Sequence, residues 1–249
     1  MVPFMIYALC ATYRHPELLA TTLAHWNEQD YPADQRRLLI LDDAQTFENQ
    51  EGENWQLISH PERFPTLSEK YNHLLAMVPC DDDGVLILDD DNTLFPSYVS
   101  RHAEALKHGD FSIPKWVFSD ASGKAQVIDC NHFYHSVVGA SRDLMCRIGG
   151  WPETRRADFD HQILRSLHSH AKKLVEPWTV PADIQYMYRW HTGHAHGQHA
   201  HLAGPGDNFW YDRCKDIYAP VTYVGKLVPK IDPMSAKFIE QVRILRETL

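Results

Sequence analysis

The first 110 residues alternate between apolar runs and segments in which apolar residues recur at helical spacing. The apolar runs, which predict strands, are residues 4–11, 37–41, 55–59 and 84–88. The first of these is apolar without alternation, as expected of a parallel strand that is buried on both faces. Helices are predicted from Pro16, from the Thr66–Glu69 capping box and from Pro96. This order of elements predicts an α/β fold with a mostly parallel central sheet flanked by helices.

The pattern changes after about residue 110. Residues 111–138 predict short strands around a Ser-Gly turn, and Ser141 predicts the cap of a short helix that ends at Gly149 and Gly150. The remaining predicted elements are a helix over 158–171, a strand over 184–190, a long loop over 191–207 and a terminal helix over 235–248. We therefore expect a single domain over 1–249 with a smaller, mixed second region.

The composition is that of an ordinary globular chain with an acidic balance. The 249 residues include 33 acidic residues against 24 Lys and Arg, a formal net charge of −9. A general nucleic-acid binder needs a cationic surface, so this charge argues against that class. Five widely spaced cysteines without a C-x-x-C motif predict reduced thiols and a cytoplasmic protein. No apolar run is long enough to predict a transmembrane segment.

Three polar clusters follow predicted strands, at the point where each strand ends. They are Thr12–Arg14, Asp42–Asp43 and Asp89–Asn92. Ligands of open parallel sheets bind beyond the carboxyl ends of the strands, so we expect all three clusters at one edge. Asp89 and Asp91 point the same way in an extended backbone and could bind one hard divalent cation together with phosphate oxygens. The alternative is a set of acids near a helix N-terminus.

Further candidate residues lie along the chain. One carboxylate of the Asp42–Asp43 pair either accepts hydrogen bonds from a nucleobase or ribose, or the pair forms a turn after the strand. Asp158, with Asp160 close by, is either a general base over the sheet edge or a helix N-cap. Three cations either balance a diphosphate or lie at the surface: Lys70, Arg155 and Arg156.

Taken together, these segments resemble the family 2 glycosyltransferases of the GT-A fold. Residues 4–45 are similar to the family's opening, a strand, a Thr-Tyr turn, a helix and a second strand that ends in two aspartates. Residues 68–99 are similar to its helix, strand and DxD segment, and 137–167 to its acceptor-side segment with Gly-Gly-Trp. The resemblance covers roughly residues 3–170. It implies a Rossmann-like sheet and a smaller acceptor-side region.

The resemblance implies roles for these residues in an inverting transfer from a nucleotide sugar, taken as UDP-linked. The donor-binding residues would be Ala11, Thr12, Asp43, Lys70, Asp89 and Asp90. Asp89 and Asp91 would bind Mn²⁺ or Mg²⁺, and Asp158, or Asp160, would be the catalytic base. Gly150 and Trp151 would shape the acceptor side.

The resemblance also divides the chain into three functional parts. These are a nucleotide-sugar-binding half (1–110), an acceptor and catalytic half (111–190), and a His-rich loop with a C-terminal helix (191–249).

Histidine is unusually abundant, with 16 residues, of which five lie between 191 and 201. Some GT-A enzymes use a histidine downstream of the base as a further metal ligand. This loop is in the corresponding place, and its flanking glycines favour His194 or His196 as that ligand. The alternative is a polar loop that titrates near neutral pH.

Four functions therefore compete, and the metal-dependent glycosyltransferase leads. The alternative is a GT-A module that binds a nucleotide sugar or glycan without turnover, since Ala44, Gln45 and Ala157 depart from the family pattern. A nucleotidyltransferase would need a Gly-rich loop after the first strand, which is missing. A His-rich metal-buffering protein is the fourth. The acceptor stays open among a glycan, a lipid-linked sugar, a protein side chain and a modified nucleobase.

Overall fold

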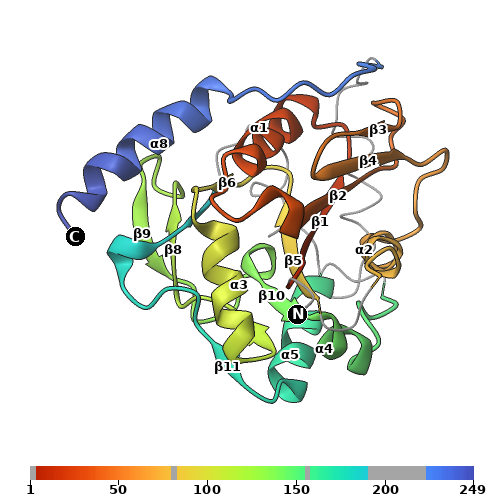
Figure 1. Cartoon of the computed structure of the whole chain (residues 1–249). Coiled ribbons are helices and arrows are strands. Elements are labelled where there is room, and N and C mark those ends of the chain that lie inside the picture. Colours follow the sequence, from red (N-terminus) through yellow and green to blue (C-terminus); the bar gives the residue numbers. More distant parts are fainter. Residues whose placement is uncertain (1–3, 80–82, 155–157, 190–222) are drawn as a thin grey trace.

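The computed structural model describes residues 4–79, 83–154, 158–189 and 223–249. A large central sheet is flanked by helices, and a smaller sheet lies beside it under the C-terminal helix (Figure 1). The large sheet has the strand order β11-β7-β10-β5-β1-β2-β4-β3, and the small sheet has the order β6-β12-β8-β9. This architecture confirms the predicted α/β class.

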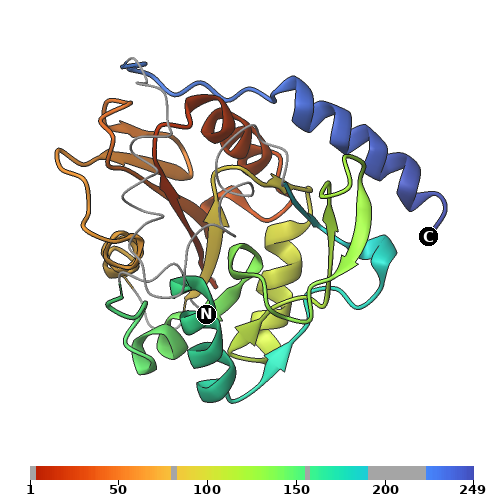
Figure 2. The ribbon, with the colours of Figure 1, turned by 180° about the vertical axis from the view of Figure 1, so that it is seen from behind.

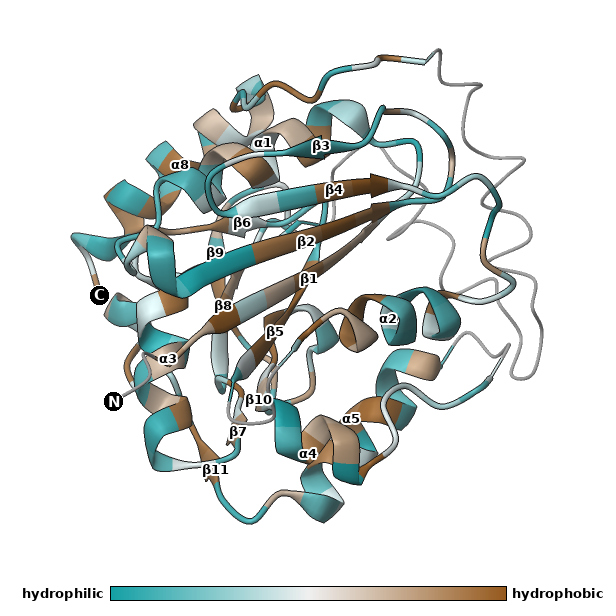
Figure 3. Ribbon diagram, turned by 45° about the vertical axis from the view of Figure 1, so that its right-hand side comes forward, coloured by the Kyte–Doolittle hydropathy of each residue, from teal (hydrophilic) through white to brown (hydrophobic). Residues whose placement is uncertain are grey.

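The strands predicted from apolar runs form the centre of the large sheet. They are β1 (Ile6–Thr12), β2 (Arg36–Asp42), β4 (Trp55–Ser59) and β5 (Gly84–Asp89). All their pairings with one another are parallel, with Ile6 opposite both Arg36 and Gly84. Figure 3 shows these strands largely in brown, the hydrophobic end of its scale. The sheet is completed by β3 (Gln50–Glu51), β7 (Phe111–Ser112), β10 (Gly139–Ser141) and β11 (Leu174–Val175).

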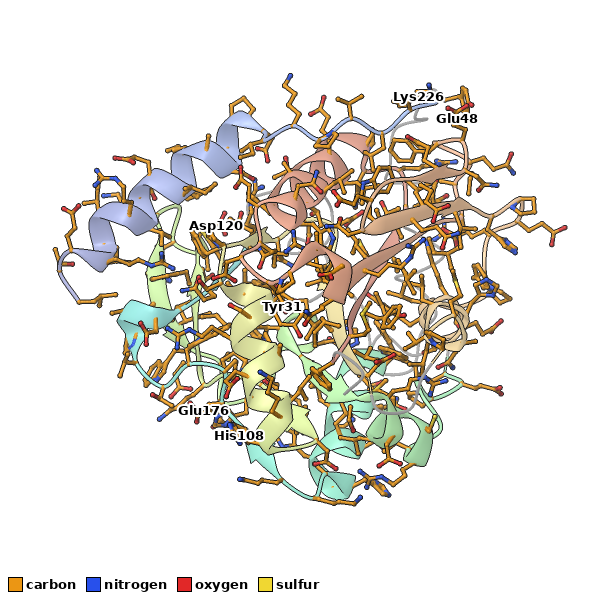
Figure 4. All side chains as sticks on the ribbon, in the orientation of Figure 1. Tyr31, Glu48, His108, Asp120, Glu176 and Lys226 are labelled. Carbon is orange, nitrogen blue, oxygen red and sulfur yellow. The ribbon has the colours of Figure 1, made fainter. Side chains whose placement is uncertain are left out.

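Successive residues of β1 belong to two different hydrophobic clusters, because side chains alternate between the faces of a sheet. Ile6, Ala8 and Cys10 pack with α1 (Pro16–Asn27), α3 (Tyr98–His108) and α8 (Pro233–Arg246). Tyr7 and Leu9 pack with α2 (Leu67–Ala76), α4 (Arg142–Arg147) and α5 (Phe159–His170). The view from behind shows the same layers, and side chains fill the space between them (Figures 2 and 4). The sheet is therefore covered on both faces.

Part of the change of pattern after residue 110 corresponds to a small second sheet. It consists of β6 (Thr93–Leu94), β8 (Trp116–Ser119), β9 (Gln126–Asp129) and β12 (Tyr186–Tyr188). The strand expected over 184–190 is shorter than predicted, and β6 was not predicted. Such short strands depend on partners far away in the sequence: β6 pairs with β12.

The N-terminus of α8 is fixed by a partly buried polar network. Asp232 caps the helix through Oδ1, which accepts from the backbone N–H groups of Met234 and Ser235. Its Oδ2 lies 3.2 Å from Arg189 Nη1, whose side chain is only 2% exposed, and 3.1 Å from Thr21 Oγ1 on α1. This carboxylate therefore connects α8 to α1 and to the residue that follows β12.

We predict that Asp232→Asn destabilises the protein, because the amide still caps the helix through Oδ1 but loses the charge that faces Arg189. Burial raises the pKa of Asp232, but its hydrogen bonds with Ser235 and the charge of Arg189 outweigh this and lower the pKa to about 2. The ionised carboxylate therefore stabilises the fold above its ordinary pKa of 3.8, and this contribution is lost as the pH falls towards about 2. Urea unfolding should show a deficit of about 1–2 kcal/mol near neutral pH that shrinks below pH ~4. A deficit independent of pH would contradict this account.

The segment that leads into α8 pairs with the loop between β2 and β3. Phe47 and Gly225 form a parallel bridge, and the backbone N–H of Glu48 donates to the Gly225 carbonyl at 3.0 Å. Figure 4 labels Glu48 and Lys226 at this junction.

No helix among the described residues has the length and apolar character that crossing a membrane requires.

Candidate functional site

The three polar clusters predicted at one edge are adjacent in the sheet. Within the parallel register, Thr12 at the end of β1 lies opposite Asp42 at the end of β2. On the other side of β1, Ala11 lies opposite Asp89 at the end of β5. The predicted convergence of these strand ends is therefore confirmed, and the side chains of each cluster have distinct environments.

Asp42 stabilises the turn that follows β2. It is fully buried, and its carboxylate accepts from the backbone N–H groups of Ala44, Thr46 and Phe47 at 3.0, 2.7 and 3.2 Å. Burial raises its pKa, although these hydrogen bonds oppose the shift. The hydrogen bonds that its carboxylate accepts from the described residues all come from its own loop, so the Asp42 side chain has a structural role.

Asp43, the predicted donor-binding residue of the pair, is ion-paired to Lys70. Asp43 Oδ1 lies 2.5 Å from Lys70 Nζ, and both side chains are at most 2% exposed. Lys70 also donates to the Thr12 carbonyl at 2.5 Å, and Asp43 Oδ2 accepts from the Phe64 N–H at 3.1 Å. The positive charge of Lys70 is therefore matched inside the protein by Asp43. The pair fixes the ends of β1 and β2 relative to α2.

Asp90 is held by residues at the end of β1 and the start of α1. Its Oδ2 accepts from Thr12 Oγ1 at 2.5 Å and lies 3.1 Å from His15 Nδ1. Burial raises the pKa of Asp90, but its interactions with His15 and Thr12 outweigh burial and lower it. Burial likewise lowers the pKa of His15, yet Asp90 raises it overall. Asp90 thus positions Thr12 next to Asp89 and Asp91. His15, which was not among the predicted site residues, is the second side chain that holds Asp90.

Asp89 and Asp91 flank Asp90 in the sequence. Asp89 is half-buried, and its Oδ1 accepts from the Tyr71 hydroxyl at 3.2 Å. Its Oδ2 accepts no hydrogen bond from the described part of the chain. Asp91 is 7% exposed. Burial, followed by the charges of Asp91, Asp89 and Asp160, raises the pKa of Tyr188. Tyr188 therefore lies within range of both the strand-end carboxylates and the start of α5.

The predicted acceptor-side residues are joined to this edge through α2. The side-chain amide of Asn72 donates to the Trp151 carbonyl at 2.9 Å and accepts from the Trp151 N–H at 2.8 Å. The indole of Trp151 stacks on Tyr71, with ring centroids 4.9 Å apart. Since Tyr71 also donates to Asp89, one helix positions both Asp89 and the Gly-Gly-Trp loop.

We predict that Gly150→Ala disturbs this contact, whereas Gly149→Ala does not. Both glycines have positive φ, +74° and +76°, so either alanine costs about 1 kcal/mol of backbone strain. A Cβ on Gly150 would also lie 2.4 Å from Asn72 Oδ1, while a Cβ on Gly149 meets nothing within 4 Å. Urea unfolding should show Gly150→Ala to be the less stable variant by about a further 1–2 kcal/mol. Equal losses would contradict the close packing of Gly150 against Asn72.

The two candidate bases lie at the start of α5. Asp158 occupies the N-cap position, but its side chain makes no capping hydrogen bond. Its Oδ1 accepts from Gln162 Nε2 at 2.9 Å, its Oδ2 lies 3.5 Å from Arg165, and the side chain is 33% exposed. Asp160 Oδ1 accepts from the His161 N–H at 2.7 Å. The N-cap alternative therefore does not describe the Asp158 side chain.

Other predicted site residues lie outside the described residues. These are His194 and His196, with the rest of the 191–201 loop, and the cations Arg155 and Arg156. The described residues contain no group of three or more His, Cys, Asp or Glu side chains that could hold a metal ion.

Comparisons with known proteins assign the fold. No protein-family model matches the chain, and no curated protein matches it either. Among solved structures, the fold is that of GT-A-like glycosyltransferases. S. aureus TarS 1-349 has a TM-score of 0.61 at 12% identity, over 75% of this chain and 61% of that chain. The mannosyltransferase PcManGT from Pyrobaculum calidifontis has a TM-score of 0.52 at 18% identity, over 76% of this chain and 57% of that chain.

The solved structures hold ligands of one chemical class. Crystal structures of TarS contain UDP or UDP-GlcNAc, and the PcManGT structure is a complex with GDP-Man and Mn²⁺. The present chain spans 37% of the longer TarS chain and 58% of TarS 1-349 in its UDP-GlcNAc complex. At these identities the likeness establishes the fold alone.

Proposed function

We propose that the chain is a metal-dependent inverting glycosyltransferase, which transfers a sugar from a UDP-linked donor to an acceptor hydroxyl. The observation that carries this proposal is the shared edge of β1, β2 and β5, where Asp89 and Asp91 adjoin Thr12 and Asp43. The GT-A-like fold and the nucleotide-sugar ligands of its structural neighbours support it.

The donor set fits a hard divalent cation. Asp89 offers a carboxylate oxygen without a hydrogen bond from the described residues, and Asp91 follows two positions later. Two carboxylates are too few for a complete coordination shell, and Mg²⁺ and Mn²⁺ are often bound by one or two carboxylates together with substrate phosphates. A bound cation would stabilise the negative charge on the departing nucleoside diphosphate. His194 or His196 would add an imidazole ligand to the carboxylates.

The residues of the chain itself would bind the donor and move one proton. Thr12, Ala11 and Asp43 form the nucleotide side, and the Lys70 ion pair fixes Asp43 in place. Asp158, whose carboxylate does not cap α5, accepts the proton of the acceptor hydroxyl as that oxygen attacks the anomeric carbon. The nucleoside diphosphate departs from the opposite face, so the anomeric configuration inverts.

The experiment that tests this function is donor hydrolysis by the whole chain. UDP-GlcNAc, UDP-glucose and GDP-mannose are each incubated with Mn²⁺, with Mg²⁺ and with EDTA. We expect release of nucleoside diphosphate and sugar only with a divalent cation, and proton NMR should detect the inverted anomer first. Glycan, lipid-linked, peptide and nucleoside acceptors are then supplied as well. If the protein binds the donor without turnover under all of these conditions, a nucleotide-sugar-binding module is favoured instead.

A further inference from the structure

His135 is a buried histidine whose two ring nitrogens differ in their contacts. It begins the short 3₁₀ helix His135–Val137 and is 8% exposed. Its Nε2 accepts from Trp151 Nε1 at 2.9 Å. Burial lowers its pKa to about 4, so the ring is neutral near pH 7. A neutral imidazole that accepts at Nε2 carries its proton on Nδ1. Nδ1 has no hydrogen-bond partner in the described part of the chain.

Three aromatic rings hold the imidazole in place. Tyr71, Trp151 and Phe159 approach it edge-on, with centroid distances of 5.5, 6.0 and 5.4 Å. Together with the indole hydrogen bond, these contacts fix the direction of the Nδ1–H bond. Nδ1 is not among the buried, unpartnered polar atoms of the described residues, so this fixed donor is open to solvent and a ligand acceptor can reach it.

The neighbours of His135 connect it to the donor side and to the acceptor side of the proposed site. Tyr71, which contacts the ring, donates to Asp89, and the charge of Asp89 acts on His135. Phe159, which also contacts the ring, directly follows Asp158 in the chain. If Asp89 holds the diphosphate through a cation and Asp158 faces the acceptor, the transferred sugar lies between them. His135 contacts Tyr71, the partner of Asp89, and Phe159, the neighbour of Asp158, so it has contacts toward both residues.

We propose that His135 Nδ1–H donates a hydrogen bond to a hydroxyl of the transferred sugar, and that Trp151 positions the ring for this contact. The inference rests on the proposed function. A neutral N–H suits an uncharged hydroxyl oxygen, whereas a phosphate would favour a cationic donor. His135 is therefore a binding residue for the sugar ring of the donor, and Trp151 is a positioning residue.

The test compares affinities for a nucleotide sugar and for its nucleotide. Calorimetry with Mn²⁺ measures the Kd of UDP-GlcNAc and of UDP, or of GDP-mannose and GDP if that pair binds. In His135→Gln the amide reaches the Nε2 position, so it keeps the contact to Trp151 but loses the donor at Nδ1. We expect UDP-GlcNAc to bind about tenfold more weakly and UDP to bind as in the wild type.

Two further variants separate recognition from structure. In His135→Asn the amide lies near the Nδ1 position, so it should retain most of the preference for UDP-GlcNAc over UDP. Trp151→Phe keeps a ring but removes the indole N–H, and should reduce that preference about threefold. It provides a test even if a His135 variant does not fold.

The outcomes distinguish the two proposals. An equal loss of UDP and UDP-GlcNAc affinity in folded His135→Gln, or no loss of either, would overturn the sugar contact and leave the proposed function standing. A wild-type protein that binds neither nucleotides nor nucleotide sugars would overturn the proposed function and this inference with it.

Discussion

Asp91→Asn is expected to reduce Mn²⁺-dependent hydrolysis of the nucleotide sugar by about 10³-fold. The amide occupies the same volume as the carboxylate but is a much weaker ligand for a hard cation. Asp91 is 7% exposed and lies next to Asp90, whose hydrogen bond from Thr12 is unchanged in the variant, and the amide has the same shape as the carboxylate. We therefore expect the variant to fold normally and to lose cation binding.

The measurement is the rate of nucleoside diphosphate release at increasing Mn²⁺ concentration. Asp34→Asn provides the matched control, because Asp34 is exposed in the short 3₁₀ helix Ala33–Gln35 before β2, away from the strand ends. This control should hydrolyse the donor at the wild-type rate. If Asp91→Asn retained both the wild-type rate and the wild-type Mn²⁺ dependence, the cation site would have to be built without Asp91.

The central sheet was predictable because its strands are buried on both faces. An unbroken apolar run such as Ile6–Ala11 has few alternatives to a parallel strand, and the strand ends then share one edge automatically. The short strands of the second sheet carry no such pattern. β6 has two residues, and its pairing with β12 depends on contacts across more than 90 intervening positions, from Leu94 to Tyr186.

The sequence predicts the location of the site better than it predicts the role of each residue in it. The sequence places Asp42 and Asp43 together, but only the fold shows that Asp42 binds its own loop while Asp43 pairs with Lys70. The same holds for Asp90, whose partners are Thr12 at the end of β1 and His15, the residue before α1, at least 75 residues earlier. Side-chain partners of this kind are fixed by tertiary packing, which no local spacing records.

His135 shows a further limit of the sequence. It is one of 16 histidines, and attention falls first on the five between 191 and 201. Its significance depends on the indole of Trp151, 16 positions later, and on Tyr71 of α2. The only local signal is the Gly-Gly-Trp motif, which identifies Trp151 without its partner.

Asp158→Asn is expected to lower the turnover of donor hydrolysis by about 10³-fold while leaving donor affinity near the wild-type value. The general base acts on the attacking hydroxyl or water, so its loss raises the barrier without removing a donor contact. The amide can keep the hydrogen bond from Gln162 through its oxygen, so α5 should stay intact.

Asp160→Asn is the matched comparison, since it lies two residues further along the same helix. Its Oδ1 is engaged by the His161 N–H, a contact that an asparagine oxygen can keep, so turnover should change by only a few-fold. Rates under saturating donor, together with the Kd of UDP-GlcNAc for each variant, separate turnover from binding. The reverse result, loss in Asp160→Asn and retention in Asp158→Asn, would move the base to Asp160. Retained turnover in both would mean that neither carboxylate takes the proton, and the acceptor would then have to be activated by a residue elsewhere along the sheet edge.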